Sequence, residues 1–318
     1  MEVHLTPADL RVAMERDVRR GLDSSPKELP PVYFYDDRGS RLFDEITRLP
    51  EYYPTRAERA ILEQHGRDIA RTAGASILVE LGAGTCDKSR VILDAMRDEG
   101  LLGGFAPLDV SDTTLWEAVS ALAVEYPGVA MTAVVGDFHE HLACLPREGV
   151  RLFAFLGGTI GNLDPTQRQG FYADLLADML PGDHLLLGCD LIKDPARLIA
   201  AYDDAQGVTA EFNRNVLHVI NAELGADFDV DRFIHPARWN AEDHRIEMWL
   251  ECAEATTVEI SDLGLRIEFA AGEAMRTEIS TKFDPEDLRR ELDASGFAVE
   301  SSWFSPGDDF LLTLATPK

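Results

Sequence analysis

A short apolar run that passes through a glycine turn into a helix constrains this chain more than any other feature. Residues 76–90 read Ser-Ile-Leu-Val-Glu-Leu-Gly-Ala-Gly-Thr-Cys-Asp-Lys-Ser-Arg, and the apolar part over residues 77–80 predicts a buried strand. A glycine turn between a strand and the start of a helix is where nucleotide cofactors bind in open α/β folds. The stretch therefore predicts an α/β domain with a site for a nucleotide-type cofactor.

The residues of this turn narrow the class of cofactor. A dinucleotide pyrophosphate is usually held by three glycines, but only Gly82 and Gly84 are present. Cys86 and Asp87 occupy positions that should leave room for phosphate, which disfavours an NAD-dependent oxidoreductase. The acid Glu80, just before the turn, suits a cofactor with a positive amino group and no phosphate. S-adenosylmethionine fits that description.

Apolar strands and helical stretches alternate from residue 55 to about residue 192. This rhythm is typical of a parallel sheet with helices on both faces. The expected strands cover residues 77–80, 105–109, 129–135, 152–156 and 184–191. The expected helices cover residues 55–72, 89–96, 113–123 and 165–180.

The character of the chain changes after residue 192. Two helices are expected over residues 195–224, and polar alternation between turns then predicts antiparallel strands over residues 246–252, 257–260 and 265–269. The α/β pattern resumes with a helix over residues 285–294, N-capped by Asp284, and a hairpin over residues 298–304 and 310–316. We expect one domain from residues 55–192 and 283–318, and a second α+β domain from residues 1–54 and 193–282.

Composition excludes several classes of function. A formal charge of -27 and a pI near 4.5 disfavour tight binding to a phosphate backbone, so we expect no nucleic-acid partner. The cysteines form no C-x-x-C pair, which favours free thiols and no metal site. The N-terminal residues lack a signal-peptide pattern, and no run approaches the roughly 18 apolar residues of a membrane span. We expect a cytoplasmic monomer without a membrane partner.

A cofactor of this type requires acids at the ends of the next strands, and the sequence supplies them. Asp109 ends the second strand, 27 residues after Gly82 (109 − 82), near the offset of about 20 that places an acid on ribose hydroxyls. Asp137 follows the third strand, where it can accept from the adenine amine, and Phe138 offers an aromatic face to the base. Any one of these acids is more often a solvated residue at a strand end, but their order favours a binding site.

Lys88 lies in the first turn of the helix after the glycine turn. A cation there is slightly unfavourable against the helix dipole, which hints at a function. Pairing with the carboxylate of the cofactor explains it, and a salt bridge to Glu80 or Asp87 explains it equally well.

Candidate groups for an acceptor molecule lie elsewhere in the chain. Asn162 ends the loop 157–162 after the fourth strand, and its amide can donate and accept at once, as a grip on an amino acid requires; a tight turn is the alternative. Tyr52, Tyr202 and Asn213 are more often core or rim residues than ligands.

Several short sequence segments, taken together and in order, resemble the L-histidine Nα-methyltransferases of ergothioneine biosynthesis. The resemblance covers nearly the whole chain, and several of the segments lie outside the cofactor domain. The segments are Pro50-Glu-Tyr-Tyr-Pro-Thr-Arg56, Leu78-Val-Glu-Leu-Gly-Ala-Gly-Thr85, Gly136-Asp-Phe138, Leu156-Gly-Gly-Thr-Ile-Gly-Asn-Leu163, Phe212-Asn-Arg-Asn-Val216 and Thr277-Glu-Ile-Ser280.

The resemblance implies a class I, Rossmann-like methyltransferase sheet with a second, substrate-binding domain. It implies trimethylation of the α-amino group of L-histidine, with S-adenosylmethionine as the donor and no metal. The positions that match the family's S-adenosylmethionine contacts are Gly82, Lys88, Asp109, Asp137 and Phe138. The positions that match its histidine contacts are Tyr52, Asn162, Tyr202, Glu278, Ile279 and Ser280.

Three alternatives to this interpretation stay open. The acceptor can be another free amino acid, such as tryptophan, or a small amine. The cofactor domain can bind its ligand without catalysis, as a sensor or partner subunit, and an NAD-dependent oxidoreductase is the third. Comparing the binding of S-adenosylhomocysteine and NAD separates a methyltransferase from an oxidoreductase.

Overall fold

The computed structural model describes residues 1–318, which divide into two compact units. Unit 1 comprises Met1–Thr6, Pro54–Ile192 and Lys282–Lys318, and unit 2 comprises Pro7–Tyr53 and Lys193–Thr281. The division that we expected placed residues 1–6 with the insert, and this was wrong. Strand β1 (Glu2–Val3) pairs in parallel with β5 (Val134–Val135), so backbone hydrogen bonds hold the N-terminal residues in unit 1.

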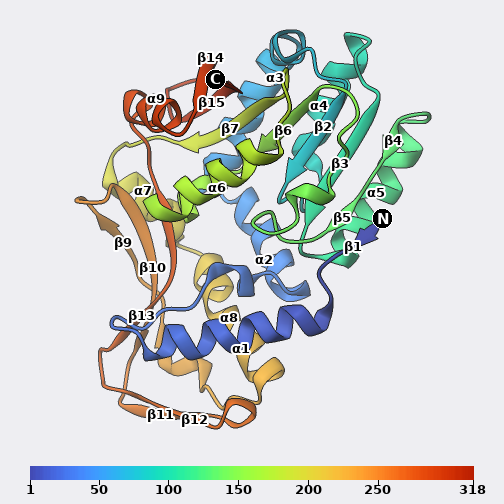
Figure 1. The fold of residues 1–318 in the computed structure, drawn as a ribbon. Helices are drawn as coiled ribbons and strands as arrows, with labels where there is room; N and C mark the ends of the chain where they lie inside the picture. The colour runs from blue at the N-terminus through green and yellow to red at the C-terminus, as the bar shows by residue number, and fades with distance from the viewer. The chain divides into compact units, whose positions relative to one another are not determined.

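Unit 1 is built on one nine-stranded sheet in the order β1-β5-β3-β2-β6-β7-β15-β14, with β4 paired to β3 (Figure 1). Its strands are parallel except β15, which runs antiparallel to both β7 and β14. This confirms the predicted class I methyltransferase sheet and its terminal hairpin. The remaining strands are β2 (Ile77–Leu81), β3 (Gly104–Asp109), β4 (Ala130–Met131), β6 (Arg151–Phe155), β7 (His184–Asp190), β14 (Phe297–Phe304) and β15 (Phe310–Pro317).

Helices cover both faces of this sheet, as predicted (Figure 1). One hydrophobic core joins the sheet to α3, α4 and α5, and a second core on the other face joins it to α6 and α9. The helices are α3 (Pro54–Ala73), α4 (Asp87–Asp98), α5 (Asp112–Glu125), α6 (Pro165–Asp178) and α9 (Pro285–Ala294). Short 3-10 turns cover Leu142–Cys144 and Thr159–Asn162.

Local sequence explains where these elements begin and run. Every residue of β6 and β7 is buried, which is why their sequences are nearly continuous apolar runs. Asp284 caps α9 as predicted, by accepting hydrogen bonds from Glu286 N and Asp287 N. The strand expected over residues 129–135 is interrupted, because only β4 and β5 within it pair with β3.

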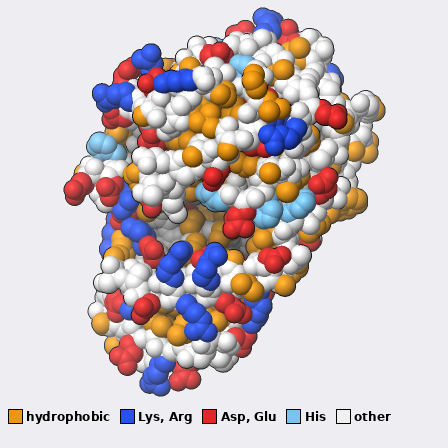
Figure 2. Space-filling view, in the orientation of Figure 1, with side chains coloured by type: hydrophobic (Ala, Val, Ile, Leu, Met, Phe, Trp, Pro, Cys, Tyr) orange, Lys and Arg blue, Asp and Glu red, His pale blue; other side chains and the backbone are white.

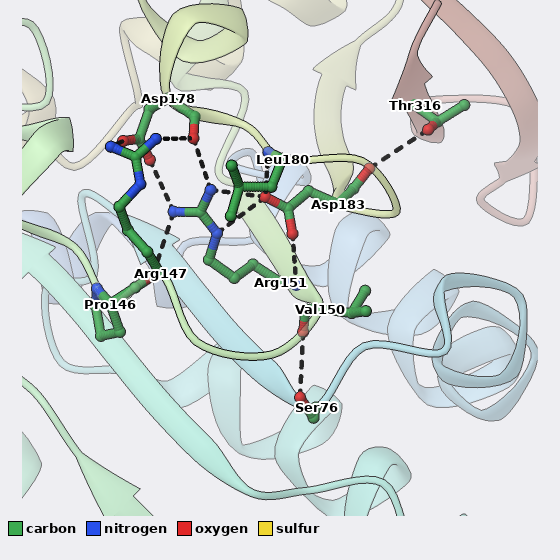
Figure 3. A network of polar contacts seen from close by, with 9 residues as sticks. All are labelled: Ser76, Pro146, Arg147, Val150, Arg151, Asp178, Leu180, Asp183 and Thr316. Carbon is green, nitrogen blue, oxygen red and sulfur yellow. Dashed lines mark hydrogen bonds and ion pairs between the residues drawn. The ribbon is translucent and has the colours of Figure 1, made fainter.

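A buried ion cluster closes the amino ends of β6 and β7 (Figure 3). The guanidinium of Arg151 is fully buried and donates to Asp183 Oδ2 from both Nε (2.9 Å) and Nη2 (2.7 Å). It also donates to Asp178 Oδ2 (2.7 Å) and to the backbone oxygens of Asp178 (2.7 Å) and Pro146 (3.2 Å). All five N–H donors of the guanidinium are therefore used within the protein.

Unit 2 is an α+β unit, which confirms the predicted antiparallel character of the insert. One sheet has the order β13-β10-β8 with β9 paired to β10, and β11 and β12 form a separate hairpin. The strands are β8 (Phe233–Ile234), β9 (Ala237–Asn240), β10 (Arg245–Cys252), β11 (Thr256–Ile260), β12 (Leu265–Phe269) and β13 (Ala274–Thr281). The helices are α1 (Pro7–Asp23), α2 (Asp37–Arg48), α7 (Pro195–Tyr202) and α8 (Val208–Leu224), with 3-10 turns over Pro31–Phe34, Val230–Arg232 and Ser261–Leu263.

The surface carries charges of both signs despite the strong net negative charge. On the face drawn in Figure 2, Lys and Arg side chains lie interspersed with Asp and Glu side chains. Many charged side chains of the protein form ion pairs, such as the bidentate contact of Arg71 with Glu99 (2.8 and 3.0 Å). None of the helices combines the length and the apolar character that crossing a membrane requires.

Candidate active site

The glycine turn after β2 has a backbone that only a few residue types adopt readily. Gly82 and Gly84 have φ values of 72° and 50°, and Cys86 also lies in the left-handed region at 56°. A Cβ atom added at either glycine meets no protein atom within 4 Å. The glycines are therefore required by conformation and not by crowding within the protein, and the turn keeps its backbone open to a ligand.

Asp109, at the end of β3, ties this turn to the neighbouring strand. Its Oδ2 accepts from Gly84 N (2.8 Å) and its Oδ1 from Ser111 N (2.9 Å). Burial raises the pKa of the Asp109 carboxyl group, and these backbone hydrogen bonds oppose that shift. Each carboxylate oxygen has further lone-pair capacity, so the group can accept ligand hydroxyls while it holds the turn.

Asp137 and Phe138 follow β5 in a loop that His141 braces. Asp137 N donates to His141 Nδ1 (3.0 Å), and Asp137 Oδ1 accepts from His139 N (2.8 Å). A Cβ atom at Gly136 would lie 2.9 Å from His141 Cβ, so glycine is needed there for the loop to fold back. Phe138 is half-buried and packs edge-on against Phe155 with ring centroids 5.2 Å apart. One edge of the sheet thus holds Gly82, Asp109, Asp137 and Phe138, as their sequence positions predicted.

Lys88 pairs with a residue that sequence reasoning missed. Its Nζ donates to Glu58 Oε2 at 2.6 Å, rather than to Glu80 or Asp87 as we considered from the sequence. Glu58 lies on α3 and is fully buried. The available signal was its position three and four residues before Ile61 and Leu62, in the apolar stripe of an amphipathic helix, where a carboxylate is out of place.

Glu80 is a second buried carboxylate near the turn. It accepts a hydrogen bond from Ser89 Oγ and forms no ion pair. Burial raises the pKa of Glu80 to about 7. No group of three or more His, Cys, Asp or Glu side chains is arranged to hold a metal ion.

Asn162 ends a 3-10 turn after β6. The two glycines that precede this turn, Gly157 and Gly158, have φ values of 80° and 70°, which allow the chain to leave the strand sharply. Asn162 is half-buried. It follows the carboxyl end of a central strand, the edge at which ligands bind in open α/β sheets.

In unit 2, the structure brings together residues that are far apart in the sequence. The Tyr202 hydroxyl and Ser280 Oγ share a hydrogen bond of 2.8 Å, and both residues are buried. The ring of Tyr52 meets that of Tyr202 edge-on at a centroid distance of 6.1 Å. Glu278 and Ser280 lie on one face of β13 because they are two residues apart, and Ile279 lies on the other.

A buried hydrogen-bond network supports this part of unit 2. Asn213 on α8 donates to His235 Nδ1 (2.7 Å) and accepts from Thr277 Oγ1 (2.6 Å), and His235 Nε2 contacts the Tyr202 carbonyl oxygen (2.8 Å). Burial lowers the pKa of His235, which favours the neutral ring, and the proton is assigned to Nε2 because Nδ1 accepts from Asn213. The network holds Tyr202 and the start of the segment 277–280, and sequence reasoning missed His235 in this role.

Comparisons with known proteins agree over the length of the chain. A family model described as "Histidine-specific methyltransferase, SAM-dependent" matches residues 14–317. Histidine N-alpha-methyltransferase from Mycolicibacterium smegmatis is 54% identical over 303 residues, which cover 95% of this chain and 94% of that protein. The enzyme of the same name from Mycobacterium tuberculosis is 53% identical and covers 98% of this chain and 97% of its own.

A more distant relative has a different printed substrate. L-tryptophan methyltransferase from Psilocybe serbica is 28% identical over 315 residues, which cover 90% of this chain and 87% of that protein. The match of the family model to residues 14–317 and the two relatives above 50% identity settle the classification. This chain belongs to the histidine-specific, S-adenosylmethionine-dependent methyltransferases.

Proposed function

We propose that this enzyme transfers three methyl groups from S-adenosylmethionine to the α-amino group of L-histidine, giving the trimethylated betaine hercynine. The observation that carries the proposal is the buried hydrogen bond of 2.8 Å between Tyr202 and Ser280, on the strand that also presents Glu278. These are polar groups for a second molecule, and they belong to a unit other than the one that holds the glycine turn.

The residues after β2, β3 and β5 fit S-adenosylmethionine. The open backbone at Gly82 accepts a ligand without a clash, Asp109 offers acceptors to ribose hydroxyls, and Asp137 with Phe138 suits the adenine base. Lys88 supplies a cation for the cofactor carboxylate. When bound, the cofactor supplies a methyl group on a positively charged sulfonium.

Different residues are proposed to bind the two ends of histidine. Asn162 and Tyr202 hold the amino acid end, while Glu278 and Ser280, on one face of β13, hold the imidazole nitrogens. Tyr52 contributes apolar surface to the same ligand, and Ile279, whose side chain lies on the other face of β13, contributes its backbone. A carboxylate that faces the imidazole selects against apolar amino acids, because an apolar side chain offers the Glu278 carboxylate no N–H donor.

The methyl transfer depends mainly on the position of the amine nitrogen relative to the methyl group. The unprotonated α-amino group is the reactive form, so it gives its proton to solvent before its lone pair attacks the methyl carbon. Holding that nitrogen in line with the methyl group supplies an entropic advantage without a strong general base. Asn162 and Tyr202 are therefore positioning groups, and no side chain needs to remove a proton in the transition state.

The test is an acceptor scan with S-adenosylmethionine and each standard amino acid, read by mass spectrometry. We expect histidine to gain up to three methyl groups and the others to react far more slowly. Equal or greater turnover of tryptophan would remove histidine as the substrate and favour the alternative of another amino acid. Binding of S-adenosylhomocysteine without turnover of any amine would favour a non-catalytic module.

A substitution at Glu278 separates the two ligands. In Glu278→Ala, we expect histidine affinity to fall about 100-fold, because a charge-assisted hydrogen bond is lost, while S-adenosylhomocysteine affinity stays within about twofold. Calorimetry measures both. Glu268→Ala, on exposed β12, is the matched control and should change neither affinity. Unchanged histidine affinity in the Glu278 variant would take this residue out of the site.

A further inference from the structure

Glu58 is a fully buried carboxylate that none of the proposed contacts uses. It lies on α3, and both of its oxygens accept from the backbone nitrogen of Gly157, at 2.8 and 2.9 Å. Its Oε2 also accepts from Lys88 Nζ at 2.6 Å. A buried carboxylate is costly unless paired and hydrogen-bonded, and here a cation and a backbone amide meet that requirement.

Two glycines make room for this arrangement. A Cβ atom at Gly188 on β7 would lie 2.2 Å from Glu58 Oε1, so any other residue there would displace the carboxylate. A Cβ atom at Gly157 would lie 3.1 Å from Lys88 Nζ, so a side chain there would crowd the ammonium. The absence of a side chain at both glycines leaves space for the acid and for the lysine, which indicates a built site and not an incidental surface pair.

The exposure of the two partners is unequal. The side chain of Glu58 is 0% exposed, whereas that of Lys88 is 24% exposed. Glu58 thus cannot touch a ligand, but the ammonium that it holds can, since an ammonium has three N–H donors and Glu58 accepts one. A lysine without such a partner would lose more rotamer entropy when it is fixed on a ligand.

We propose that Glu58 is a positioning residue that holds the Lys88 ammonium ready for the α-carboxylate of S-adenosylmethionine. Gly157 N fixes the carboxylate of Glu58, and Glu58 in turn orients the lysine. This inference rests on the proposed cofactor site, because it assigns the carboxylate end of the same ligand. Binding of the α-carboxylate should therefore depend on Glu58, whereas binding of the nucleoside should not.

Two ligands and one near-isosteric substitution test this assignment. S-adenosylhomocysteine carries the α-carboxylate and α-amine, whereas 5′-methylthioadenosine has the same nucleoside and lacks both. In Glu58→Gln, the amide oxygen can still accept from Gly157 N, but its NH₂ group faces the Lys88 donors, so the lysine loses its orientation. Glu63→Gln, on the exposed face of the same helix, is the matched control.

We expect E58Q to weaken S-adenosylhomocysteine about tenfold and 5′-methylthioadenosine by less than about twofold in calorimetry, with K88M showing the same pattern. Equal weakening of both ligands would show that Glu58 only supports the loop, and no weakening would also overturn the proposal. Wild-type protein that binds neither ligand would instead refute the cofactor site itself.

A structure of the wild type with S-adenosylhomocysteine tests the same point without any variant. We expect Lys88 Nζ to lie within hydrogen-bonding distance of Glu58 Oε2 and of the ligand carboxylate at once. A Lys88 side chain that leaves Glu58, or a carboxylate held elsewhere, would overturn the proposal even where E58Q does not fold.

Discussion

Buried ion pairs lie at both ends of the central strands of unit 1, and they differ in how completely their partners are used. At the amino ends of β6 and β7, all five donors of Arg151 are taken by Asp178, Asp183 and Pro146 (Figure 3). At the carboxyl end of β6, Glu58 accepts one donor of Lys88, whose side chain is still 24% exposed. The first cluster, at the closed end, uses every donor of its cation within the protein, whereas the second, at the open end, leaves part of its cation exposed.

The two clusters differ in whether all donors of the buried cation are used within the protein, and this difference separates a role in stability from a role in binding. A cluster whose donors all end on protein atoms can contribute only to folding, because nothing remains to recognise a ligand. A buried acid that holds a partly exposed lysine can do both. Removing charge at the two ends should therefore have different consequences, which substitutions can measure.

The largest expected effect is on folding, at the closed end. Arg151→Met leaves Asp178 and Asp183 as buried acids without their cation, which should lower the free energy of unfolding by about 3–5 kcal/mol. Urea denaturation measures this change. Affinity of the folded protein for S-adenosylhomocysteine should stay within about twofold, and a tenfold loss would break the distinction between the two ends.

Next in size is a pH effect at the open end. Burial raises the pKa of Glu80 from 4.5 to about 7. The folded state therefore binds this proton more tightly than the unfolded state, and ionising Glu80 costs stability as the pH rises. The cost is absent below pH 4.5, grows up to about pH 7 and is then constant at about 3 kcal/mol.

Glu80→Gln provides the reference for this effect, because glutamine does not titrate. Relative to that variant, the wild type should lose about 3 kcal/mol of unfolding free energy between about pH 4.5 and about pH 8. Urea titrations of both proteins across this range measure the difference. Parallel pH profiles for the two proteins would show that Glu80 is not the buried acid described above.

A smaller effect is expected for ligand affinity at Asp109. Asp109→Asn replaces one acceptor with a donor, which opposes the N–H groups of Gly84 or Ser111 and weakens contacts to ribose hydroxyls. We expect about 30-fold weaker binding of S-adenosylhomocysteine, or about 2 kcal/mol, by calorimetry. Asp112→Asn, exposed at the start of α5, is the control, and an equal loss there would assign the effect to general charge.

The smallest effect is expected when both members of the Glu58–Lys88 ion pair are replaced. The double variant E58Q/K88M has neither buried acid nor cation, so its free energy of unfolding should lie within about 1 kcal/mol of the wild type. Its affinity for S-adenosylhomocysteine should remain about tenfold weaker, no worse than either single variant, since the two residues act as one unit. Full additivity of the single losses would show that Glu58 and Lys88 act independently.

Much of the fold was predictable because it depends on local pattern. Buried parallel strands such as β6 require continuous apolar runs, which a short window of sequence shows. Asp284 before Pro285 likewise indicates the start of a helix from adjacent residues alone. The strand expected over residues 129–135 was less predictable, since an apolar run does not reveal which residues find a partner strand. The pairing of residues 2–3 with β5 escaped prediction for the same reason.

The family, the glycine turn and the order of acids after the strands were predictable from the amino-acid sequence, because each depends on contiguous residues or on their spacing. The acid that pairs with Lys88 became known from the three-dimensional structure, since 57 acidic residues were candidates and the partner lies 30 residues away on another helix. The tertiary structure likewise brought Tyr202 to Ser280 across 78 residues. Periodicity fixes which face of an element is buried, but the contacts between elements depend on packing, which no local pattern contains.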